Sequence, residues 1–494
     1  MSDSVQANEE LWSLQRIQDY FSGSSDVIIE SYQIQEYAPA SQIVLTFAIG
    51  LCDTVEIGKT VLPALKRLYN ETQFNGGQHS NMMSTLPLLP IETSHIAGQF
   101  AESVFEGDLV LFIPKTNAFY KLSIANTPKR TPGESKTEIS IKGPRDGFVE
   151  DIVINVALIR KRIRSNSLCH ETLVLGRRTK TKIGVLYIND LIQPSMIQEV
   201  RKRLKDIDID GIYSIGQLEE MIVDSKYSIF PLIDFTGRPD YVINALLNGR
   251  FIIVVDGNPM VLVGPATLSL LMKSPEDIHF NFLYISFVRI IRVISLFLSI
   301  LLPGLWVALS AFHQDQVPFR LLATIGVSRQ GLPFSPQMEL FVLLLLLEIF
   351  REAGLRLPSS IGQTLTVIGG LIIGDAAIRA GLVSPSVVVV GAITAVSGAT
   401  LVNQSLSSAL SVIRFLLFFA ASFLGMYGLI LGFILLAIYV SRLRSFGNTF
   451  VEPLSNRPIA DVLKSLIRLP WKLMIRRPAR YNTIDNDHQG EDTA

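Results

Sequence analysis

Hydrophobic and polar residues are distributed differently in the two halves of this 494-residue chain. Up to about residue 282, short apolar runs alternate with segments in which apolar residues recur every three or four positions. The first pattern is typical of β-strands and the second of amphipathic helices. Beyond residue 282 the apolar runs are long. We therefore predict a multi-domain protein: a cytoplasmic α/β N-terminal half of two subdomains, followed by an α-helical transmembrane bundle.

The soluble half divides into two predicted α/β subdomains, residues 26–124 and 143–282, behind a polar N-terminal segment, residues 1–25. In the first subdomain, DVIIESYQI, SQIVLTFAIGL and DLVLFIPKTNAFYKLSI have strand patterns, and VEIGKTVLPALKRLYN has a helical one. Residues 125–142 are rich in Pro, Lys, Thr and Ser, which predicts a linker or an extended loop. The second subdomain alternates helices with strands such as TKIGVLYIND and RFIIVVDG, which implies helices packed on small sheets.

The predicted transmembrane domain, residues 283–441, is depleted of charge. Of the 44 basic and 44 acidic residues in the chain, thirteen lie between Asn281 and Val440, and none of them is Lys. The run from Val293 to Phe312 has twenty residues without a charge. At about 1.5 Å per residue it spans a hydrocarbon core of roughly 30 Å. We favour four crossings, with one segment re-entrant or broken.

Basic residues give the predicted orientation. Arg289 and Arg292 precede the first long apolar run, and the tail, residues 442–494, is basic over SRLRS and KSLIRLPWKLMIRRPAR. Cytoplasmic flanks carry an excess of Lys and Arg, so both termini are predicted to lie in the cytoplasm. The polar, acidic N-terminus lacks the apolar core of a secretion signal, which agrees with this orientation.

Four charged residues at helical spacing follow the apolar run Leu340 to Leu347: Glu348, Arg351, Glu352 and Arg356. Spacings of three and four positions permit ion pairs along a helix at the membrane edge. The alternative is that some of these residues lie at a pore mouth. Arg414 separates two later apolar runs, and it either marks a membrane edge or reaches into the bundle.

The segment Ile361 to Gly381 mixes polar and small residues with apolar ones, which suits a helix that faces other helices or a water-filled path. Its candidate pore-lining residues are Gln363, Thr364, Val367, Ile368, Leu371 and Asp375. Four of these share one helical face, namely Thr364, Val367, Ile368 and Leu371. That face offers a polar entrance and an apolar constriction that closes by excluding water. An apolar stripe packed inside the bundle explains the same spacing equally well.

Composition and motifs give no positive evidence for an enzyme, a metal site or a cofactor. The net charge of zero gives no support to a nucleic-acid partner. Cys52 and Cys169 are too few for a disulfide framework, and no paired His stands near either at metal-ligand spacing.

The sequence IGKT, from Ile57 to Thr60, is similar to the end of a phosphate-binding loop. Asp53, however, stands where the first Gly of such a loop belongs. A plain helix start is the better interpretation.

Several stretches, in a fixed order, resemble the A subunits of the GerA family of spore germination proteins in endospore-forming bacteria. They include GPRDGFVED, LGRRTKTKIGVLYI, FTGRPDYVINALLNGRFIIVVDGNPMVLVGP, LPFSPQMEL and EIFREAGLRLPSSIGQTLTVIGGLIIGDAAI. The resemblance covers Gly143 to about Pro453, and the residues before Gly143 match loosely. One departure is that Thr449 and Phe450 replace the Pro-Tyr pair usual in the family, so this end is expected to engage partners differently.

The resemblance implies a subunit of a nutrient-responsive complex in the inner spore membrane, surrounded by membrane lipid. It implies a homo-oligomeric ring, a pentamer, that forms a ligand-gated ion channel. Its partners would be a transporter-like B subunit that binds the nutrient and a lipoprotein C subunit. Members similar to the stage V sporulation AF type suggest an accessory channel that amplifies ion release without its own nutrient sensor. A secondary transporter and a scaffold are the alternatives from other classes.

The soluble half is predicted to be a ring-forming interaction module without a catalytic site. Its candidate assembly motif is Arg238, Pro239 and Asp240 at the start of a predicted helix. Charged residues at a helix start commonly make capping and inter-element contacts. Substitution of Arg238 or Asp240 is therefore expected to disturb folding or assembly.

Overall fold

The computed structural model describes residues 12–35, 41–74, 86–91, 96–126, 141–356 and 374–452, with residues 462, 467–470 and 485. The chain forms two compact units. The first unit, called the sheet unit, consists of Met1–Lys226, Ile233–Pro265 and Ile475–Ala494 and contains two five-stranded sheets. The second, called the helical unit, consists of Tyr227–Leu232 and Ala266–Met474.

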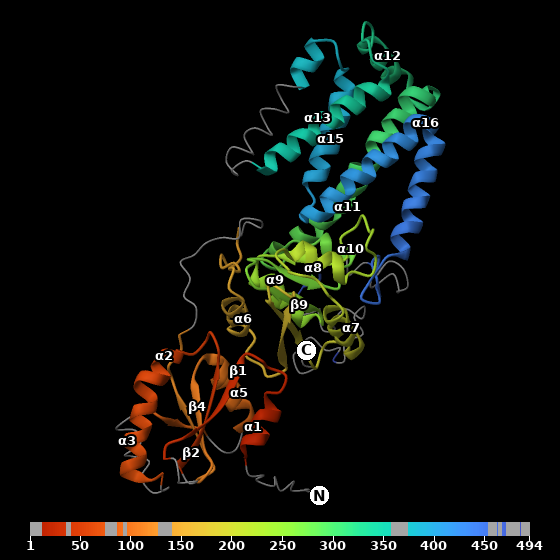
Figure 1. Cartoon of the computed structure of the whole chain (residues 1–494). Coiled ribbons are helices and arrows are strands. Elements are labelled where there is room, and N and C mark those ends of the chain that lie inside the picture. Colours follow the sequence, from red (N-terminus) through yellow and green to blue (C-terminus); the bar gives the residue numbers. More distant parts are fainter. Residues whose placement is uncertain are drawn as a thin grey trace, which may run out of the picture. The chain divides into compact units, whose positions relative to one another are not determined.

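The first sheet is antiparallel, in the order β1-β2-β4-β5-β3 (Figure 1). Its strands are β1 (Val27–Gln33), β2 (Gln42–Ala48), β3 (Leu89–Pro90), β4 (Leu109–Ile113) and β5 (Ala118–Leu122). Its helical elements are α1 (Leu14–Tyr20), α2 (Thr54–Glu56), the π-helical turn η2 (Ile57–Val61), α3 (Leu62–Thr72) and α5 (Ile96–Glu106). These elements confirm the strand and helix patterns of the first subdomain.

Helices cover both faces of this sheet. Side chains of β2 alternate between the two faces, and those on each face pack against different helices. Ile43 and Leu45 pack with residues of η2 and α3 in one core. Val44 packs with residues of α1 and α5 in the other. The IGKT sequence lies inside a helix, where the Asp53 side chain accepts hydrogen bonds from the first turn. The helix start predicted there is confirmed.

The second sheet is also antiparallel, in the order β6-β7-β9-β10-β8. Its strands are β6 (Leu168–Leu175), β7 (Thr181–Ile188), β8 (Asp234–Thr236), β9 (Phe251–Val255) and β10 (Val261–Gly264). Its helices are α6 (Ile152–Arg160), α7 (Pro194–Lys205), α8 (Ile215–Ile222) and α9 (Pro239–Leu247). β9 is buried over its whole length, as expected for a central strand with both faces covered.

A buried ion pair joins the two sheets' subdomains. Arg160, at the end of α6, is fully buried and donates to the two carboxylate oxygens of Asp26 at 2.8 and 2.9 Å. It also donates to Ser24 Oγ at 3.1 Å, and His170 Nδ1 lies 3.5 Å from Asp26. Burial alone would raise the pKa of Asp26, but the Arg160 guanidinium outweighs burial and holds that pKa well below its usual range.

The helical unit contains the apolar half of the chain. Its elements are α10 (Leu268–Leu271), η4 (Pro275–Ile278), α11 (Phe282–Val307), η5 (Ala308–Phe312), η6 (Gln314–Gln316), α12 (Phe319–Ser328), α13 (Pro336–Arg356), α15 (Pro385–Ala399), α16 (Gln404–Arg442), β11 (Arg444–Ser445) and β12 (Asn448–Thr449). Among the described residues, two helices are long and apolar enough to cross a membrane, Phe282–Phe312 and Gln404–Arg442. The number of crossings stays a prediction.

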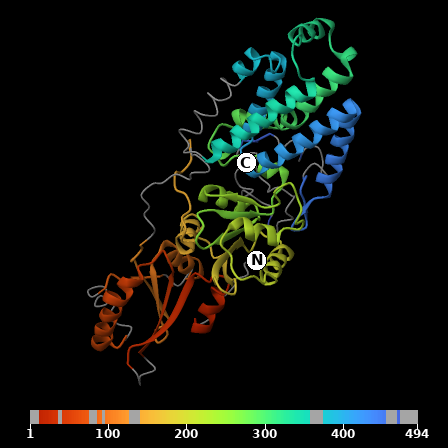
Figure 2. The same ribbon diagram turned by 45° about the horizontal axis from the view of Figure 1, so that its top comes forward.

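The helix α16 folds back on itself at Gly425, as Figures 1 and 2 show. Gly425 has φ of 62° and ψ of −141°, a conformation that favours glycine. The two arms pack closely because glycine leaves room between them. A Cβ added at Gly432 would lie 2.7 Å from Leu417 Cδ2, and one at Gly428 would lie 2.1 Å from the Ala420 carbonyl oxygen.

The core of the helical unit lies where α11, α13, α15 and α16 meet. Its buried members include Val307, Leu340, Leu344, Val387 and Phe418. Phe341 stacks on Phe418 with ring centroids 6.3 Å apart. The outward faces of these helices are also apolar, which is typical of a surface that meets lipid or neighbouring subunits.

Candidate functional site

Charged side chains meet among the apolar helices at one point between α13 and α16. Arg351 Nη2 donates to Glu348 Oε1 at 2.5 Å, and Arg414 Nη2 donates to Glu348 Oε2 at 3.2 Å. Arg414 is only 7% exposed. Arg351 Nη1 donates to Ser407 Oγ at 3.3 Å, and Arg414 Nη2 donates to Ser411 Oγ at 2.6 Å. We call these five residues the inner charge cluster.

Helical spacing on both elements assembles the cluster. Glu348 and Arg351 are three positions apart on α13, so both point to one side. Ser407, Ser411 and Arg414 are likewise four and three positions apart near the start of α16. The Asn403 side chain caps that helix by accepting from the backbone N–H of Leu406 at 2.8 Å. Two permanently charged guanidiniums therefore share one carboxylate, and the cluster carries a net positive charge.

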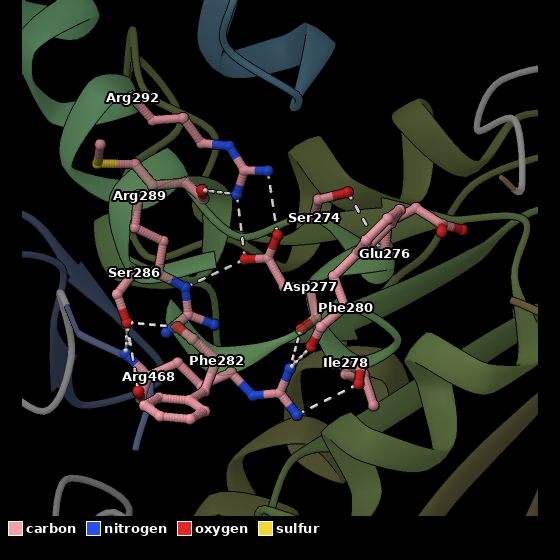
Figure 3. Close-up of polar contacts among 11 residues, drawn as sticks. Ser274, Glu276, Asp277, Ile278, Phe280, Phe282, Ser286, Arg289, Arg292 and Arg468 are labelled. Atoms are coloured by element: carbon pink, nitrogen blue, oxygen red, sulfur yellow. Dashed lines mark hydrogen bonds and ion pairs between the residues drawn. The ribbon is translucent and has the colours of Figure 1, made fainter. Parts of the chain in front are cut away.

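A second cluster lies at the start of α11 (Figure 3). Asp277, in η4, is 2% exposed and binds two arginines of α11. Arg292 donates to both carboxylate oxygens at 3.0 and 3.1 Å, and Arg289 Nε donates to Oδ2 at 3.1 Å. Together with Ser286 and Arg468, these residues form what we call the junction cluster. Its two ion pairs fix η4 to the second and third turns of α11.

Arg468 connects the C-terminal segment to the same place (Figure 3). Its guanidinium donates to three backbone carbonyls, that of Asp277, that of Ile278 at 3.2 Å and that of Phe280 at 2.9 Å. Its own backbone N–H donates to Ser286 Oγ at 3.1 Å, and the Ser286 hydroxyl donates to the Arg468 carbonyl at 3.3 Å. Arg468 is 8% exposed. The segment 467–470 is thus bound to the start of α11.

A third buried carboxylate has a single arginine partner. Glu339, at the start of α13, is fully buried and accepts from Arg329 Nε at 3.1 Å. Its other oxygen accepts from the backbone N–H and the hydroxyl of Ser384 at 3.1 and 3.0 Å. Ser384 precedes α15, so the carboxylate also meets the positive end of a helix dipole. This contact ties α12, α13 and α15 together.

The candidate pore residues fall mostly outside the described residues. This holds for Gln363, Thr364, Val367, Ile368, Leu371 and the side chain of Arg356. Asp375 is described, and its exposed side chain lies 2.8 Å from Arg379. Glu352 is exposed. Glu348 and Arg351 form the ion pair expected from their spacing. Arg414 is buried and donates to Glu348 on α13, and whether it also lies at a membrane edge stays a prediction.

The candidate assembly motif forms an internal pair. Arg238 is 2% exposed and donates to the two oxygens of Asp240 at 3.1 and 2.7 Å. Pro239 occupies the first turn of α9, where a missing N–H has no cost.

In the sheet unit, burial together with the Asp234 and Glu220 carboxylates raises the pKa of Glu219 to about 7. No group of three or more His, Cys, Asp or Glu that could hold a metal ion occurs among the described residues.

Sequence reasoning missed the roles of Asp277 and Arg468. A local signal exists for Asp277, because Arg289 and Arg292 share a helical face and an acidic residue shortly precedes the helix. Arg468 has no such signal, since it lies 191 positions from Asp277. A contact over that separation depends on the tertiary fold.

Comparison with known proteins shows what the chain is similar to. The model of the family described as Bacillus/Clostridium GerA spore germination protein matches residues 15–480. Spore germination protein XA of Bacillus anthracis is 40% identical over 491 residues, 99% of this chain and 98% of that protein. The membrane protein YfkQ of Bacillus subtilis is 36% identical, over 81% of this chain and 78% of that protein. The crystal structure of the N-terminal domain of the A subunit of the Bacillus megaterium spore germinant receptor GerK3 is 28% identical, with a TM-score of 0.40, over 52% of this chain and 94% of that one.

Proposed function

The chain belongs to the GerA family of spore germination proteins, and we propose that it is the membrane subunit of a germination receptor complex that forms an oligomeric, ligand-gated ion channel. Relatives such as spore germination proteins XA, B1 and A1 carry the names of germination proteins and not of enzymes. A role in spore germination is therefore supported by the family. The channel mechanism is our proposal.

The observation that supports a channel is the inner charge cluster. Placing an Arg at the centre of a membrane helix costs about 2.5–3.5 kcal/mol on insertion scales. Ionised residues in such helices face the bundle interior or a water-filled cavity and commonly mark ion pathways. Arg351 and Arg414 lie on helices with long apolar runs, one of which is long enough to cross a membrane. This position favours an ion-handling role over plain packing.

The ion path in this proposal runs along the helix predicted to begin at Ile361. Thr364 would be its polar entrance, and Val367, Ile368 and Leu371 would form its constriction. Val367→Ala or Ile368→Ala should then widen the constriction and make the channel leaky. If the segment only packs inside the bundle, the same change lowers stability instead. Ion release measured beside protein abundance separates the two: normal abundance with unchanged, nutrient-dependent release would remove this helix from the path.

The proposed assembly is a homo-oligomeric ring, a pentamer, in the spore inner membrane with both termini in the cytoplasm. A transporter-like B subunit would bind the nutrient and a lipoprotein C subunit would complete the complex. A water-filled lumen shared by the subunits would satisfy the hydrogen-bonding groups of polar residues such as Gln363 and Thr364. A single helical bundle has little room to do so. Native mass measurement in mild detergent should show a homo-oligomer, and a functional monomer would contradict this.

The Arg238 and Asp240 pair gives a test of the soluble half. Arg238→Gln leaves Asp240 without its bidentate partner, so we expect weaker folding or assembly. The double variant Arg238→Gln with Asp240→Asn should recover part of the loss if the pair acts internally. If it recovers folding but not oligomer, the pair also serves assembly. Normal assembly with loss of a measurable turnover would contradict the interpretation of this half as a non-enzymatic module.

The experiment that tests the channel directly is ion flux through full-length protein reconstituted in vesicles. We expect flux that does not saturate at low ion concentration and that Glu348→Gln alters. Val412→Ala, an exposed site on α16, is the matched control and should leave flux unchanged. Saturable, substrate-coupled uptake would support a secondary transporter. No flux from an intact oligomer would contradict conduction by this chain alone.

A further inference from the structure

We infer that the inner charge cluster is a binding site for one small monovalent anion. The inference goes beyond the proposed channel, because it concerns binding at equilibrium and holds whether or not ions flow. It rests on two independent observations, a charge imbalance and a pair of unsatisfied donors. Both concern Arg351 and Arg414.

Among the described residues, Arg351 and Arg414 form ion pairs with Glu348 alone. Glu352, the next residue on α13, is exposed. A guanidinium cannot lose its proton in a protein, and an uncompensated buried charge costs several kcal/mol. Glu348 already serves both arginines. Glu339 pairs with Arg329, and Asp375 pairs with Arg379. Residues 357–374 contain no charged side chain, so the next segment of the chain cannot supply a counter-ion.

The unsatisfied donors are the Nε–H groups of the same two arginines. Each is buried and has no hydrogen-bond partner among the described residues. A buried donor without an acceptor costs about 1–3 kcal/mol. The hydroxyls of Ser407 and Ser411 lie beside the guanidiniums, and Ser407 is in the first turn of α16, where the helix dipole is positive. A bound anion would accept hydrogen bonds from these Nε–H groups and would also cancel the excess positive charge of the cluster.

The exposure of the cluster sets the class of ligand. The side chains of Arg351 and Glu348 are 36% and 28% exposed, while that of Arg414 is 8% exposed. The α13 side of the cluster is therefore partly exposed, whereas Arg414 is buried. A net charge of one positive unit matches a monovalent anion, and the burial of Arg414 favours a small one such as acetate. An ordered water would satisfy a donor but would leave the charge uncancelled.

Thermal unfolding of the purified full chain in detergent tests the site. Acetate replaces gluconate at constant ionic strength, so the charge and the carboxylate are matched, and the anions differ in the size and hydroxyl groups of the remaining chain. We expect the wild-type midpoint to rise and then saturate with acetate, as linkage requires of a ligand that binds the folded state. Arg379→Gln, in an exposed pair, should give the wild-type curve.

Two variants should move the response in opposite directions. Glu348→Gln removes the competing carboxylate and should lower the half-saturating acetate concentration roughly tenfold or more. Arg414→Gln should abolish the saturable rise in the unfolding midpoint. If Arg414→Gln does not fold, Arg351→Gln takes its place and should have the same effect. Equal responses of Arg414→Gln and wild type, or weaker acetate binding in Glu348→Gln, would overturn the inference. A flat wild-type curve would do the same while leaving the flux test of the channel unaffected.

Discussion

The sheet unit and the helical unit differ in how arginines are matched to the carboxylates they bind. In the sheet unit Arg160 binds Asp26, and Arg238 binds Asp240, so each of these acids has one arginine. The Arg160 pair holds helix α6 against the first sheet's subdomain. Such a pair fixes geometry, and apolar side chains of similar volume can often replace it without loss of stability.

In the helical unit two carboxylates are shared. Asp277 binds two arginines of α11, and Glu348 binds Arg351 and Arg414. The fully buried Glu339 instead pairs with a single arginine, Arg329. Stability alone does not call for an excess of positive charge among apolar helices, because each unmatched charge is costly there. The comparison teaches that matched pairs leave no excess charge, whereas the shared carboxylates leave one; at Asp277 the excess goes with a structural clamp, and at Glu348 our proposal assigns it to ion handling.

The largest effect is expected for the matched pair in the sheet unit. Asp26→Asn leaves Arg160 buried without its counter-charge and should lower the free energy of unfolding by about 3–5 kcal/mol. The double variant Asp26→Leu with Arg160→Met should recover most of this loss. Thermal unfolding of the full chain measures both. If Asp26→Asn is as stable as the wild type, the pair is not a structural clamp.

The same pair predicts an acid limit. The folded pKa of Asp26 is depressed, so its contribution is fully present above the unfolded value of about 3.9 and is lost as pH falls toward the folded pKa. Wild type should therefore lose more stability below about pH 4 than Asp26→Asn does. Parallel losses in the two proteins would contradict the assignment.

An intermediate effect is expected at the junction cluster. Arg468→Ala removes the donor to the carbonyls of Asp277, Ile278 and Phe280 and should cost about 2–3 kcal/mol. Amide exchange at the start of α11 should become faster, since the C-terminal segment no longer binds there. Arg444→Ala, at an exposed arginine, is the control. Unchanged exchange in Arg468→Ala would show that the contact does not hold the helix start.

The smallest effect is expected at Glu219. Its folded pKa of about 7 lies above the unfolded value of about 4.3, so folding becomes less favourable as pH rises from about 4 to 7. Glu219→Gln should match wild type near pH 4 and be more stable by on the order of 1–2 kcal/mol at pH 8. Glu102→Gln, at an exposed site, should track wild type. A variant equally stable at both pH values would contradict the raised pKa.

Local patterns were enough to predict many elements of the fold. The alternating residues of β2 and the helical spacing of α3 depend only on neighbours in the chain. The pair of Glu348 and Arg351 was predictable for the same reason, because both lie on one helix. Such patterns predict the position of an element and the side of it that is buried.

Contacts between distant segments were not predictable from the pattern. The partner of Arg414 lies on another helix, so its spacing gives no information about Glu348. The turn at Gly425 lies between two apolar arms and lacks the polar residues that mark turns in water. Arg468 binds residues about 190 positions earlier. Each of these features depends on how the helices pack.

The central claim is that the inner charge cluster serves ion handling and not stability. The direct measurement combines Glu348→Leu, Arg351→Met and Arg414→Met in one chain and records thermal unfolding and ion flux from the same reconstituted preparation. We predict a protein at least as stable as wild type, because apolar residues often replace buried ion groups without loss, but with altered flux and no acetate-dependent stabilisation. A triple variant that is much less stable, or one that keeps wild-type flux and acetate response, would contradict the claim.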